Sequence, residues 1–386
     1  MSLLEHYAMQ LDRLKQQGNY RQFTDNLQHG KMIQVDGHDM LNLSSNDYLG
    51  LASQTELRAQ FFEQMPLAER HLTSSSSRLL TGNFPEYEAL ENSLSQAFLG
   101  RSALLFNSGY HMNIGILPAV TDSKTLILAD KLVHASMIDG IRLSTAKYVR
   151  YRHNDLQHLK QLLQKYHDDA DIERIVVVTE SIFSMDGDET DLAALAALKS
   201  QFAKVMLYVD EAHAIGVRGE KGLGCAEQYG VIDQIDFLVG TFGKAIASVG
   251  GYLICDPIIK VYLINTMRPL IFSTALPPMS IAWTQFIFEK MQMMQAQRQH
   301  LHQMSAYLQQ QITALGYASP SSSHLVPILV GASDLAVEKA KILQKQGFYI
   351  MPVRPPTVPQ NSARLRVSLT AHIEQHELQQ LVKILA

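Results

Sequence analysis

The sequence predicts an α/β fold with a mostly parallel sheet, followed by a smaller α+β region. Short apolar runs rich in Val, Ile and Leu recur along the middle of the chain, and helical spacing lies between them, as in residues 192–201. Such runs are typical of strands buried on both faces of a parallel sheet, and alternating strands and helices indicate a doubly wound domain. The runs are ALLF (103–106), TLILA (125–129), IVVVT (175–179), VMLYV (205–209) and FLVGT (237–241).

The two ends of the chain have a different pattern. Residues 1–17 predict an amphipathic helix. The runs KMIQV and MLNLS predict two short strands around a turn at Asp36-Gly37, and residues 84–98 predict a helix. Residues 283–316 have helical periodicity, followed by strand HLVPILV, helix DLAVEKAKILQKQ, strands FYIMPV and RLRVSL, and a last helix. We therefore expect an N-terminal helix with short strands (1–45), a large α/β domain (46–280) and a small α+β domain (281–386).

Composition excludes several classes of protein. The 386 residues are 46% hydrophobic and 18% charged, with a net charge of −4 and no basic stripe of the kind that binds nucleic acid. Cys225 and Cys255 are too few for a disulfide scaffold or a cysteine zinc site, so we expect both to be buried and expect no metal. No apolar run approaches a membrane span, which predicts a reduced, cytoplasmic protein.

Asp210 directly follows the predicted strand VMLYV, where α/β proteins bind ligands. Taken alone, it could equally cap a helix or face solvent. The letters Asp-Glu-Ala-His also match the metal-binding box of some helicases. That alternative requires a phosphate loop, G-x-x-x-x-G-K-[ST]. At Gly243-Lys244, however, Leu238 stands where the first glycine should be and Ala245 where Ser or Thr should be.

Lys244 stands on a tight turn directly after the strand FLVGT. A plain surface lysine is the alternative, but an amine placed there could form a Schiff base with an aldehyde cofactor. Pyridoxal phosphate (PLP) needs such a lysine and a carboxylate that keeps its ring nitrogen protonated. Because Asp210 and Lys244 follow successive predicted strands, the pair indicates a PLP enzyme.

Other polar residues are expected at the same edge of the sheet. Ser108 and Gly109 lead into a probable helix, whose first N–H groups could bind the phosphate, and Thr241 could add a hydroxyl. The ring of His134 could stack on the cofactor, and His213 could reach its phenolic oxygen. Each could instead be merely structural. Glu180 and Ser184 follow IVVVT toward the same edge.

Together these residues resemble the α-oxoamine synthase family. The motifs occur in order along the chain: Asn46 to Gly50, Ser108-Gly109, His134 to Ser136, Glu180 and Ser184 to Asp188, Asp210 to His213, and Thr241 to Lys244. The resemblance implies the type I aminotransferase fold, a homodimer with shared active sites, and a PLP-dependent acyltransferase that condenses an amino acid with an acyl thioester.

Within the family, the run Arg354 to Pro359 and the residues Ala363 to Arg366 resemble most the member that joins L-alanine to a pimeloyl thioester in biotin biosynthesis, with loss of carbon dioxide. The thioester would be pimeloyl-acyl carrier protein or pimeloyl-CoA. The alternatives are the sister activities of glycine C-acetyltransferase, 5-aminolevulinate synthase and serine palmitoyltransferase. A catalytically silent binding protein on the same fold is a third class.

The resemblance also implies a role for each matching residue. Lys244 would carry the cofactor and act as general base, Asp210 would pair with its ring nitrogen, and Arg366 would take the alanine carboxylate. Cofactor contacts would come from Ser108, Gly109, Tyr110, His134, Glu180, Ser184, His213 and Thr241. Arg21, His134 and Thr357 would line the substrate site, and Asn46, Ser273 and Thr274 would come from the second subunit.

Overall fold

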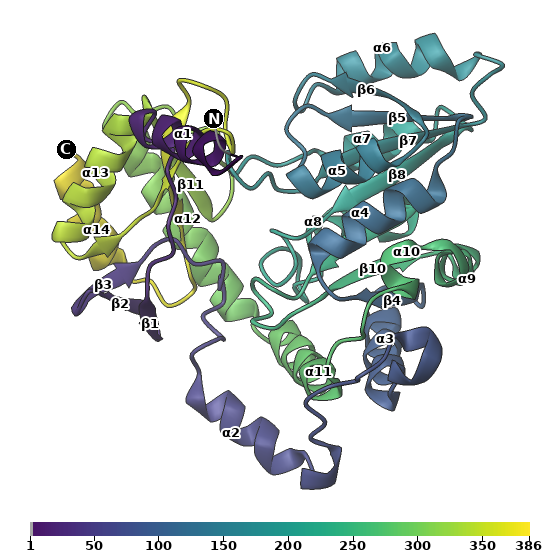
Figure 1. Ribbon diagram of the computed structural model, residues 1–386, viewed down its shortest axis with the longest axis horizontal. Helices are drawn as coiled ribbons and strands as arrows, with labels where there is room; N and C mark the ends of the chain where they lie inside the picture. The colour runs from purple at the N-terminus through teal and green to yellow at the C-terminus, as the bar shows by residue number, and fades with distance from the viewer. Residues whose placement is uncertain (1–2) are drawn as a thin grey trace. The chain divides into compact units, whose positions relative to one another are not determined.

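The computed structural model describes residues 3–386, which divide into two compact units. The central unit comprises Gln54–Phe183 and Glu189–Arg298, and the terminal unit comprises the described residues up to Ser53, Ser184–Asp188 and Gln299–Ala386 (Figure 1). These bounds differ from the expected ones, because residues 46–53 and 184–188 cluster with the terminal unit and residues 281–298 with the central unit.

A seven-stranded sheet forms the centre of the central unit, in the order β4-β10-β9-β8-β7-β5-β6. β9, β8, β7, β5 and β6 are parallel, and β10 is antiparallel to both of its neighbours, so the predicted mostly parallel α/β fold is confirmed. The strands are β4 Ser102–Phe106, β5 Thr125–Asp130, β6 Lys147–Tyr151, β7 Arg174–Glu180, β8 Val205–Asp210, β9 Phe237–Thr241 and β10 Gly251–Cys255.

The sequence analysis missed two of these strands. β6 lies at the edge of the sheet and is mostly exposed, so its sequence KYVRY lacks the apolar run of a buried strand. β10 is fully buried between β4 and β9, and its sequence GYLIC carries the apolar signal of the predicted strands. Neither strand separates β7, β8 and β9, which remain neighbours in the sheet. The predicted site residues Glu180, Asp210 and Lys244 lie at or after the carboxyl ends of these three strands.

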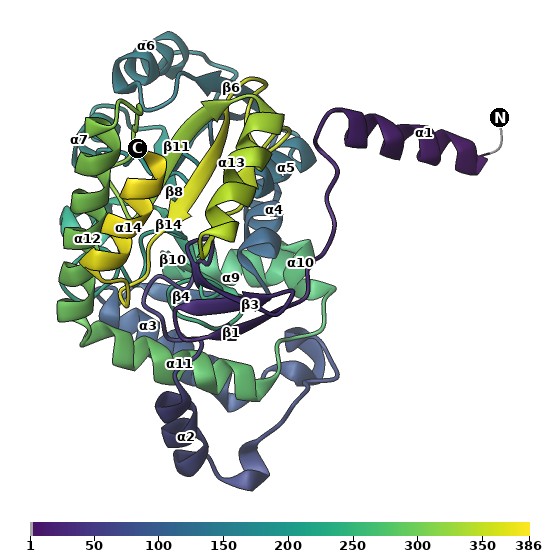
Figure 2. The same cartoon turned by 90° about the vertical axis from the view of Figure 1, so that its left-hand side faces the viewer.

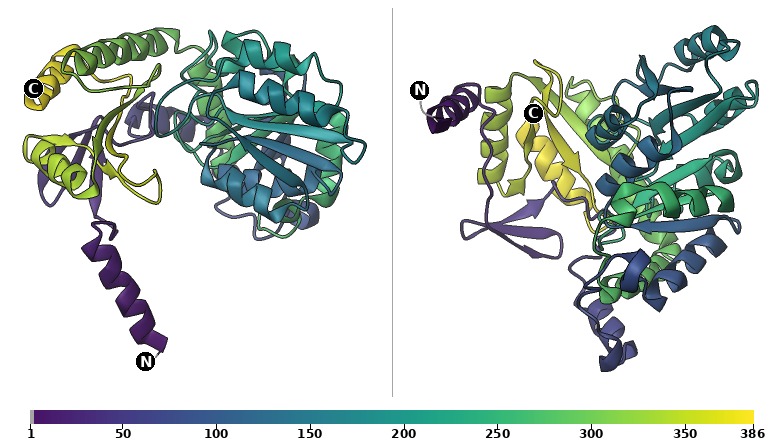
Figure 3. Two further views of the ribbon diagram at one scale, coloured as in Figure 1. Left: turned by 90° about the horizontal axis from the view of Figure 1, so that it is seen from above. Right: turned by 45° about the vertical axis from the view of Figure 1, so that its right-hand side comes forward.

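Helices cover both faces of this sheet (Figure 3). One face packs against α4, α5 and α9 through a cluster of buried side chains that includes Met112, Ile116, Met137 and Leu263. The helices of the central unit are α2 Thr55–Gln64, α3 Pro85–Ala97, α4 Gly109–Val120, α5 Ala135–Leu143, α6 Leu156–His167, α7 Leu192–Lys199, α8 Cys225–Gln228, α9 Pro257–Thr266, α10 Arg268–Ile271 and α11 Pro278–Gln292. Short 3-10 turns at Leu67–Glu69 and Ile232–Gln234 and a π turn at Arg78–Gly82 complete it.

The helical stretch expected at residues 283–316 is two helices, α11 and α12 (Gln295–Ala314). The break contains neither Gly nor Pro. The buried Arg298 donates hydrogen bonds to the carbonyl oxygens of Met291 (2.7 Å) and Gln292 (3.2 Å) at the end of α11. A side chain six or seven residues further along therefore caps α11, a contact that periodicity does not reveal.

The terminal unit contains two small sheets, with strand orders β1-β2-β3-β12 and β11-β14-β13. The single strand expected at residues 348–353 is two short strands in different sheets, separated by Ile350 and Met351, which belong to neither strand. None of the residues of α1 is buried (Figure 2). The elements are α1 Leu3–Gln16, β1 Asn26–His29, β2 Met32–Val35, β3 His38–Asn42, β11 Leu325–Gly331, α13 Ser333–Lys345, β12 Phe348–Tyr349, β13 Pro352–Val353, β14 Ala363–Ser368 and α14 Gln375–Leu385.

Two smaller expectations concern cysteines and membranes. Cys225 and Cys255 are free and fully buried, as predicted. Within residues 3–386, no helix has both the length and the apolarity that a membrane span requires.

Candidate active site

The carboxyl ends of three adjacent parallel strands form the core of the candidate site. In the register of the sheet, Glu180 at the end of β7 is the partner of Asp210 at the end of β8. Asp210 in turn pairs with Val239 of β9, five residues before Lys244. Parallel strands thus bring these two carboxylates and the lysine turn to one edge of the sheet, where open α/β sheets bind ligands.

A pocket of about 160 Å³ opens at this edge, within the central unit. Eight of the predicted site residues line it, and Lys244 is the only lysine among the described residues that do so. The lining residues are Gly109, Tyr110, Met112, Asn113, His134, Ser136, Glu180, Asp210, Ala212, His213, Thr241 and Lys244.

Hydrogen bonds hold the turn that presents Lys244. The Thr241 hydroxyl donates to the carbonyl oxygen of Gly250 (2.9 Å) and accepts from the N–H of Gly243 (3.2 Å). The Nζ atom of Lys244 lies 2.8 Å from Nε2 of His213, a buried residue. The lysine amine therefore has an imidazole beside it with which it can exchange a proton.

Both oxygens of Asp210 are held in place. Oδ1 accepts from the N–H of Ala212 (2.9 Å), and Oδ2 accepts from Nδ2 of Asn113 (3.0 Å). Asp210 is 5% exposed and Asn113 is 2% exposed. A carboxylate whose two oxygens both accept hydrogen bonds keeps its orientation, which a partner for a ring nitrogen requires. The sequence analysis missed Asn113, although an amide within the apolar stretch of α4 is a signal for such a role.

His134 and Glu180 are joined at the start of α5. His134 is the N-cap of this helix, and its backbone N–H donates to Oε1 of Glu180 (2.6 Å). Although part of the His134 ring is open to solvent, desolvation by its surroundings lowers the pKa of the imidazole. Burial, together with the nearby charge of Asp210, raises the pKa of Glu180 well above its usual value. Both shifts favour the neutral side chain.

The start of α4 provides N–H groups for an anion. Ser108 is its N-cap, and its hydroxyl accepts from the N–H of His111 (3.1 Å). Gly109 lines the pocket, and β10 approaches it closely, since a Cβ at Gly251 would lie 3.1 Å from the nitrogen of Gly109. The side chain of Tyr110 bonds to Oδ2 of Asp139 (2.6 Å). A helix N-terminus of this kind is suited to bind a phosphate.

A second polar cluster lies in the terminal unit. Ser184 belongs to the same unit. Nη2 of Arg366 donates to Oδ1 of Asn46 (3.1 Å) and to the hydroxyl of Tyr48 (3.4 Å). The buried Nε of Arg366 has no hydrogen-bond partner within the described part of the chain. Arg21 donates to the Thr357 hydroxyl (3.3 Å). The cluster thus retains an unused guanidinium donor.

Ser273 and Thr274 are outside the set of residues that lines the pocket of their own chain. The Ser273 hydroxyl donates to the carbonyl oxygen of Pro269. The carbonyl oxygen of Thr274 accepts from Nδ2 of Asn107 (2.7 Å). These bonds hold the segment that follows α10.

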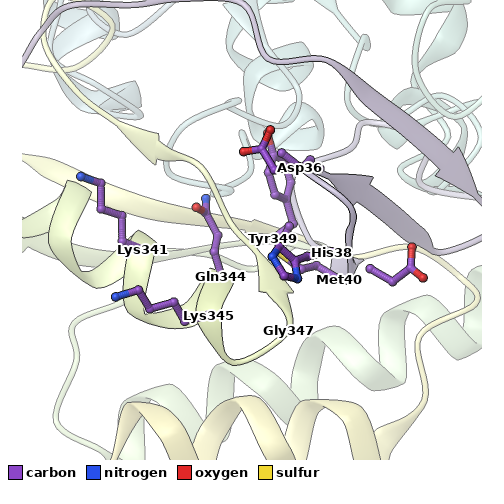
Figure 4. A pocket seen from close by; sticks show the side chains of 10 residues that line it. Asp36, His38, Met40, Lys341, Gln344, Lys345, Gly347 and Tyr349 are labelled. Carbon is purple, nitrogen blue, oxygen red and sulfur yellow. The ribbon is translucent and has the colours of Figure 1, made fainter.

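A larger cavity of about 470 Å³ lies in the terminal unit (Figure 4). Lys341, Gln344 and Lys345 of α13 lie on one side of it, and Asp36 and His38 of the β2–β3 hairpin on the other. None of the predicted site residues lines it. Its charged side chains are exposed, so we place the chemistry in the smaller pocket.

The residues of the small pocket fit PLP by their chemistry. They combine one amine, a fixed carboxylate, an imidazole and free N–H groups at a helix start, which are the groups this cofactor needs for its aldehyde, ring nitrogen, ring face and phosphate. The described residues contain no group of three or more His, Cys, Asp or Glu side chains that could hold a metal ion.

Comparisons with known proteins agree with this chemistry. Residues 38–385 match the family described as aminotransferase class I and II. The chain is 56% identical to a Pasteurella multocida protein named "Putative 8-amino-7-oxononanoate synthase", over 99% of both chains, and 55% identical to one of the same name from Haemophilus influenzae, over 98% of this chain and 99% of that one.

Solved structures show the same likeness. A serine palmitoyltransferase from S. paucimobilis with bound PLP has a TM-score of 0.89 and 26% identity, covering 100% of this chain and 97% of that one. An 8-amino-7-oxononanoate synthase from Francisella tularensis has a TM-score of 0.73 and 27% identity, covering 89% and 96%. The chain therefore belongs to the aminotransferase class I and II family of PLP-dependent enzymes, and within it to the α-oxoamine synthases.

Proposed function

We propose that the chain is an 8-amino-7-oxononanoate synthase, which condenses L-alanine with a pimeloyl thioester and releases carbon dioxide and the free thiol carrier. The observation that carries the proposal is the pocket in which Lys244, Asp210 and His134 meet at the ends of adjacent strands. The names of relatives that are 53–56% identical over nearly the full chain favour this member over its sister enzymes.

When bound, PLP supplies an electron sink for the substrate's Cα. In the proposal Asp210 keeps the cofactor's ring nitrogen protonated, since its two oxygens are fixed by Ala212 and Asn113. His134 contacts the ring, and Thr241, Ser108 and Gly109 bind the phosphate at the start of α4.

Lys244 has two roles in the proposal. Its Nζ holds the cofactor before substrate binds, and once freed it accepts the Cα proton of alanine as general base, which is worth about 10²–10⁴-fold in rate. Nε2 of His213, at 2.8 Å from Nζ, is within reach to take a proton from the amine. A lysine that is fully charged could not accept the Cα proton.

Substrate selection is assigned to the terminal unit. In the proposal Arg366 binds the alanine carboxylate, for which its planar fork is suited. Asn46 and Tyr48 hold its Nη2, and its buried Nε has no partner within the described residues. Arg21 and Thr357, already bonded to each other, form part of the acyl site. The thiol carrier is coenzyme A or acyl carrier protein.

We further propose that the enzyme is a cytoplasmic homodimer with shared sites. Ser273 and Thr274 do not line the pocket of their own chain, and in the dimer they would contact the cofactor phosphate of the other subunit. Asn46, which was also expected to come from the second subunit, bonds to Arg366 of its own chain. A mixed dimer tests this. One chain carries Lys244→Ala, and the other carries Asp at both 273 and 274.

In that mixed dimer, one site has an intact lysine and an intact Ser-Thr pair. Each parent dimer should be inactive, because one lacks the amine and the other places negative charge beside the phosphate. Activity should return when the two chains are co-expressed with different tags and the mixed dimer is isolated. A mixed dimer that forms but stays inactive would remove the shared-site assignment.

The activity itself is tested by adding alanine, glycine or serine to the PLP-loaded enzyme, then a pimeloyl thioester. Alanine should change the visible absorbance of the cofactor most and yield 8-amino-7-oxononanoate by mass spectrometry. One methyl group contributes about 1–3 kcal/mol, so selection against glycine is expected to be 10- to 200-fold at most. Faster turnover of serine with a long acyl thioester would instead support a serine palmitoyltransferase, the activity of one structural neighbour.

A further inference from the structure

Asn113 occupies the centre of a buried hydrogen-bond network in the central unit. It lies on α4 and is 2% exposed. Its amide bonds to Asp210, Ser136 and Tyr208, which belong to β8 and α5. Gly140 lets α4 and α5 approach closely enough for this, because a Cβ there would lie 2.4 Å from the carbonyl oxygen of Asn113.

The partners fix which way the amide points. A carboxylate can only accept, so the group of Asn113 that lies 3.0 Å from Oδ2 of Asp210 is its NH₂. The second N–H of the same group donates to the Ser136 hydroxyl at 2.9 Å. Oδ1 of Asn113 accepts from the hydroxyl of Tyr208 at 2.6 Å. Every polar atom of this amide is therefore used.

The network continues from Ser136 to His134. The backbone N–H of Ser136 can only donate, and it points at Nδ1 of His134 at 3.2 Å, so this ring nitrogen carries a lone pair. The Ser136 hydroxyl accepts from Asn113 and keeps its own proton to donate to the same Nδ1 at 2.7 Å. The proton of the neutral ring is then on Nε2, the nitrogen left for the pocket that His134 lines.

We propose that Asn113 is a positioning residue that ties Asp210 and His134 into one hydrogen-bonded unit and fixes the proton of the neutral His134 ring on Nε2. The proposed function is needed only to explain what this arrangement is for. In that function, one amide orients both Asp210, which pairs with the ring nitrogen, and His134, which contacts the ring face. The hydrogen bonds themselves exist without substrate or cofactor.

Histidine NMR of the cofactor-free protein tests the proposal without any activity. The protein is labelled with ¹⁵N in its histidine rings, and the signals of His134 are those lost in His134→Gln. In the wild type we expect an unprotonated Nδ1 and a protonated Nε2 from about pH 6 to 9, around and above the ordinary histidine pKa. A wild-type ring protonated on Nδ1 would overturn the proposal.

Variants then test the part played by Asn113. In Asn113→Leu the Ser136 hydroxyl loses its donor and can accept from Nδ1–H, so the Nδ1-protonated tautomer of His134 should become detectable as the minor form, because the backbone N–H of Ser136 still favours a lone pair on Nδ1. Tyr208→Phe removes only the bond to Oδ1 of Asn113 and should cause a smaller change in the same direction. Tyr252→Phe is the matched control: Tyr252 is as fully buried, but its hydroxyl makes no hydrogen bond within residues 3–386, so the His134 signals should not change.

PLP affinity gives a second readout. Asn113→Leu should weaken PLP binding by about 10- to 100-fold, the worth of one hydrogen bond to a charged group, and Tyr252→Phe should not. Folded Asn113→Leu and Tyr208→Phe proteins in which both the His134 ring signals and PLP binding match the wild type would overturn the proposal. Because the NMR arm uses protein without cofactor, its result is independent of which amino acid or thioester the enzyme accepts.

Discussion

The two cavities described above differ in what holds their polar groups. The larger one, about 470 Å³ in the terminal unit, is lined by exposed charged side chains such as Lys341 and Lys345. The smaller one, about 160 Å³ in the central unit, is lined by buried groups such as Asp210 and His213. Size therefore does not identify the site. The site is identified by polar groups that are held in fixed positions, because such groups stabilise the charge that develops in a transition state.

The difference follows from how the chain forms each cavity. The small pocket lies where β7, β8 and β9 end side by side, so its polar residues are fixed by the register of a buried sheet. The larger cavity lies between the β2–β3 hairpin and the end of α13, where side chains project into solvent (Figure 4). Substitutions in the small pocket should therefore have much larger effects than substitutions in the larger cavity.

The largest effect is expected for Lys244→Ala. The folded variant should lose both the visible absorbance of lysine-bound cofactor and all measurable turnover, because no other lysine lines the pocket within the described chain. Absorbance spectra and product detection by mass spectrometry check both. Retention of the absorbance together with normal turnover would show that the anchor is elsewhere.

Asp210→Asn should reduce kcat by about 10²–10³-fold while the protein still binds PLP. A neutral amide cannot stabilise a positive ring nitrogen, although it can keep the hydrogen bond from Ala212. Spectra with bound cofactor and steady-state rates with alanine separate binding from turnover. Normal kcat in this variant would contradict the role of Asp210.

Glu211, next to Asp210, should make stability depend on pH. Its carboxylate is fully buried, and it accepts from the Ser181 hydroxyl (2.6 Å) and the N–H groups of Cys225 (3.0 Å) and Ala226 (2.6 Å). Burial raises its pKa from 4.5 to about 7. The folded state therefore binds this proton more tightly than the unfolded state, and the resulting stability is present below the unfolded pKa and lost as pH rises through about 7.

The loss should approach about 3 kcal/mol by pH 8. Denaturant unfolding at several pH values measures it. Glu211→Gln should remove this part of the pH dependence, whereas Glu227→Gln, a half-buried acceptor for the N–H of Leu223, should keep it. A Glu211→Gln protein with the slope of the wild type would assign the dependence to other groups.

Local patterns predicted the buried strands, because a strand buried on both faces has an apolar sequence. They also predicted where Asp210 and Lys244 lie, because both residues follow directly after such a strand. Interactions between distant segments were not predictable in this way. Asn113 gains its role only when α4 lies beside β8, and the break between α11 and α12 depends on Arg298. The cluster of Arg366 with Asn46 joins residues 320 positions apart.

The smallest effect is expected in the larger cavity. Lys341→Ala and Lys345→Ala, alone or together, remove exposed ammonium groups that line it, and surface substitutions of this kind change stability by no more than about 0.5 kcal/mol. Turnover with alanine and a pimeloyl thioester, PLP affinity and the free energy of unfolding should all match those of the wild type. A KM for the thioester that rises several-fold at constant kcat would contradict this difference between the cavities, because it would show that the large cavity binds part of the acyl carrier. A single-lysine variant that shows half of that rise would identify which ammonium makes the contact.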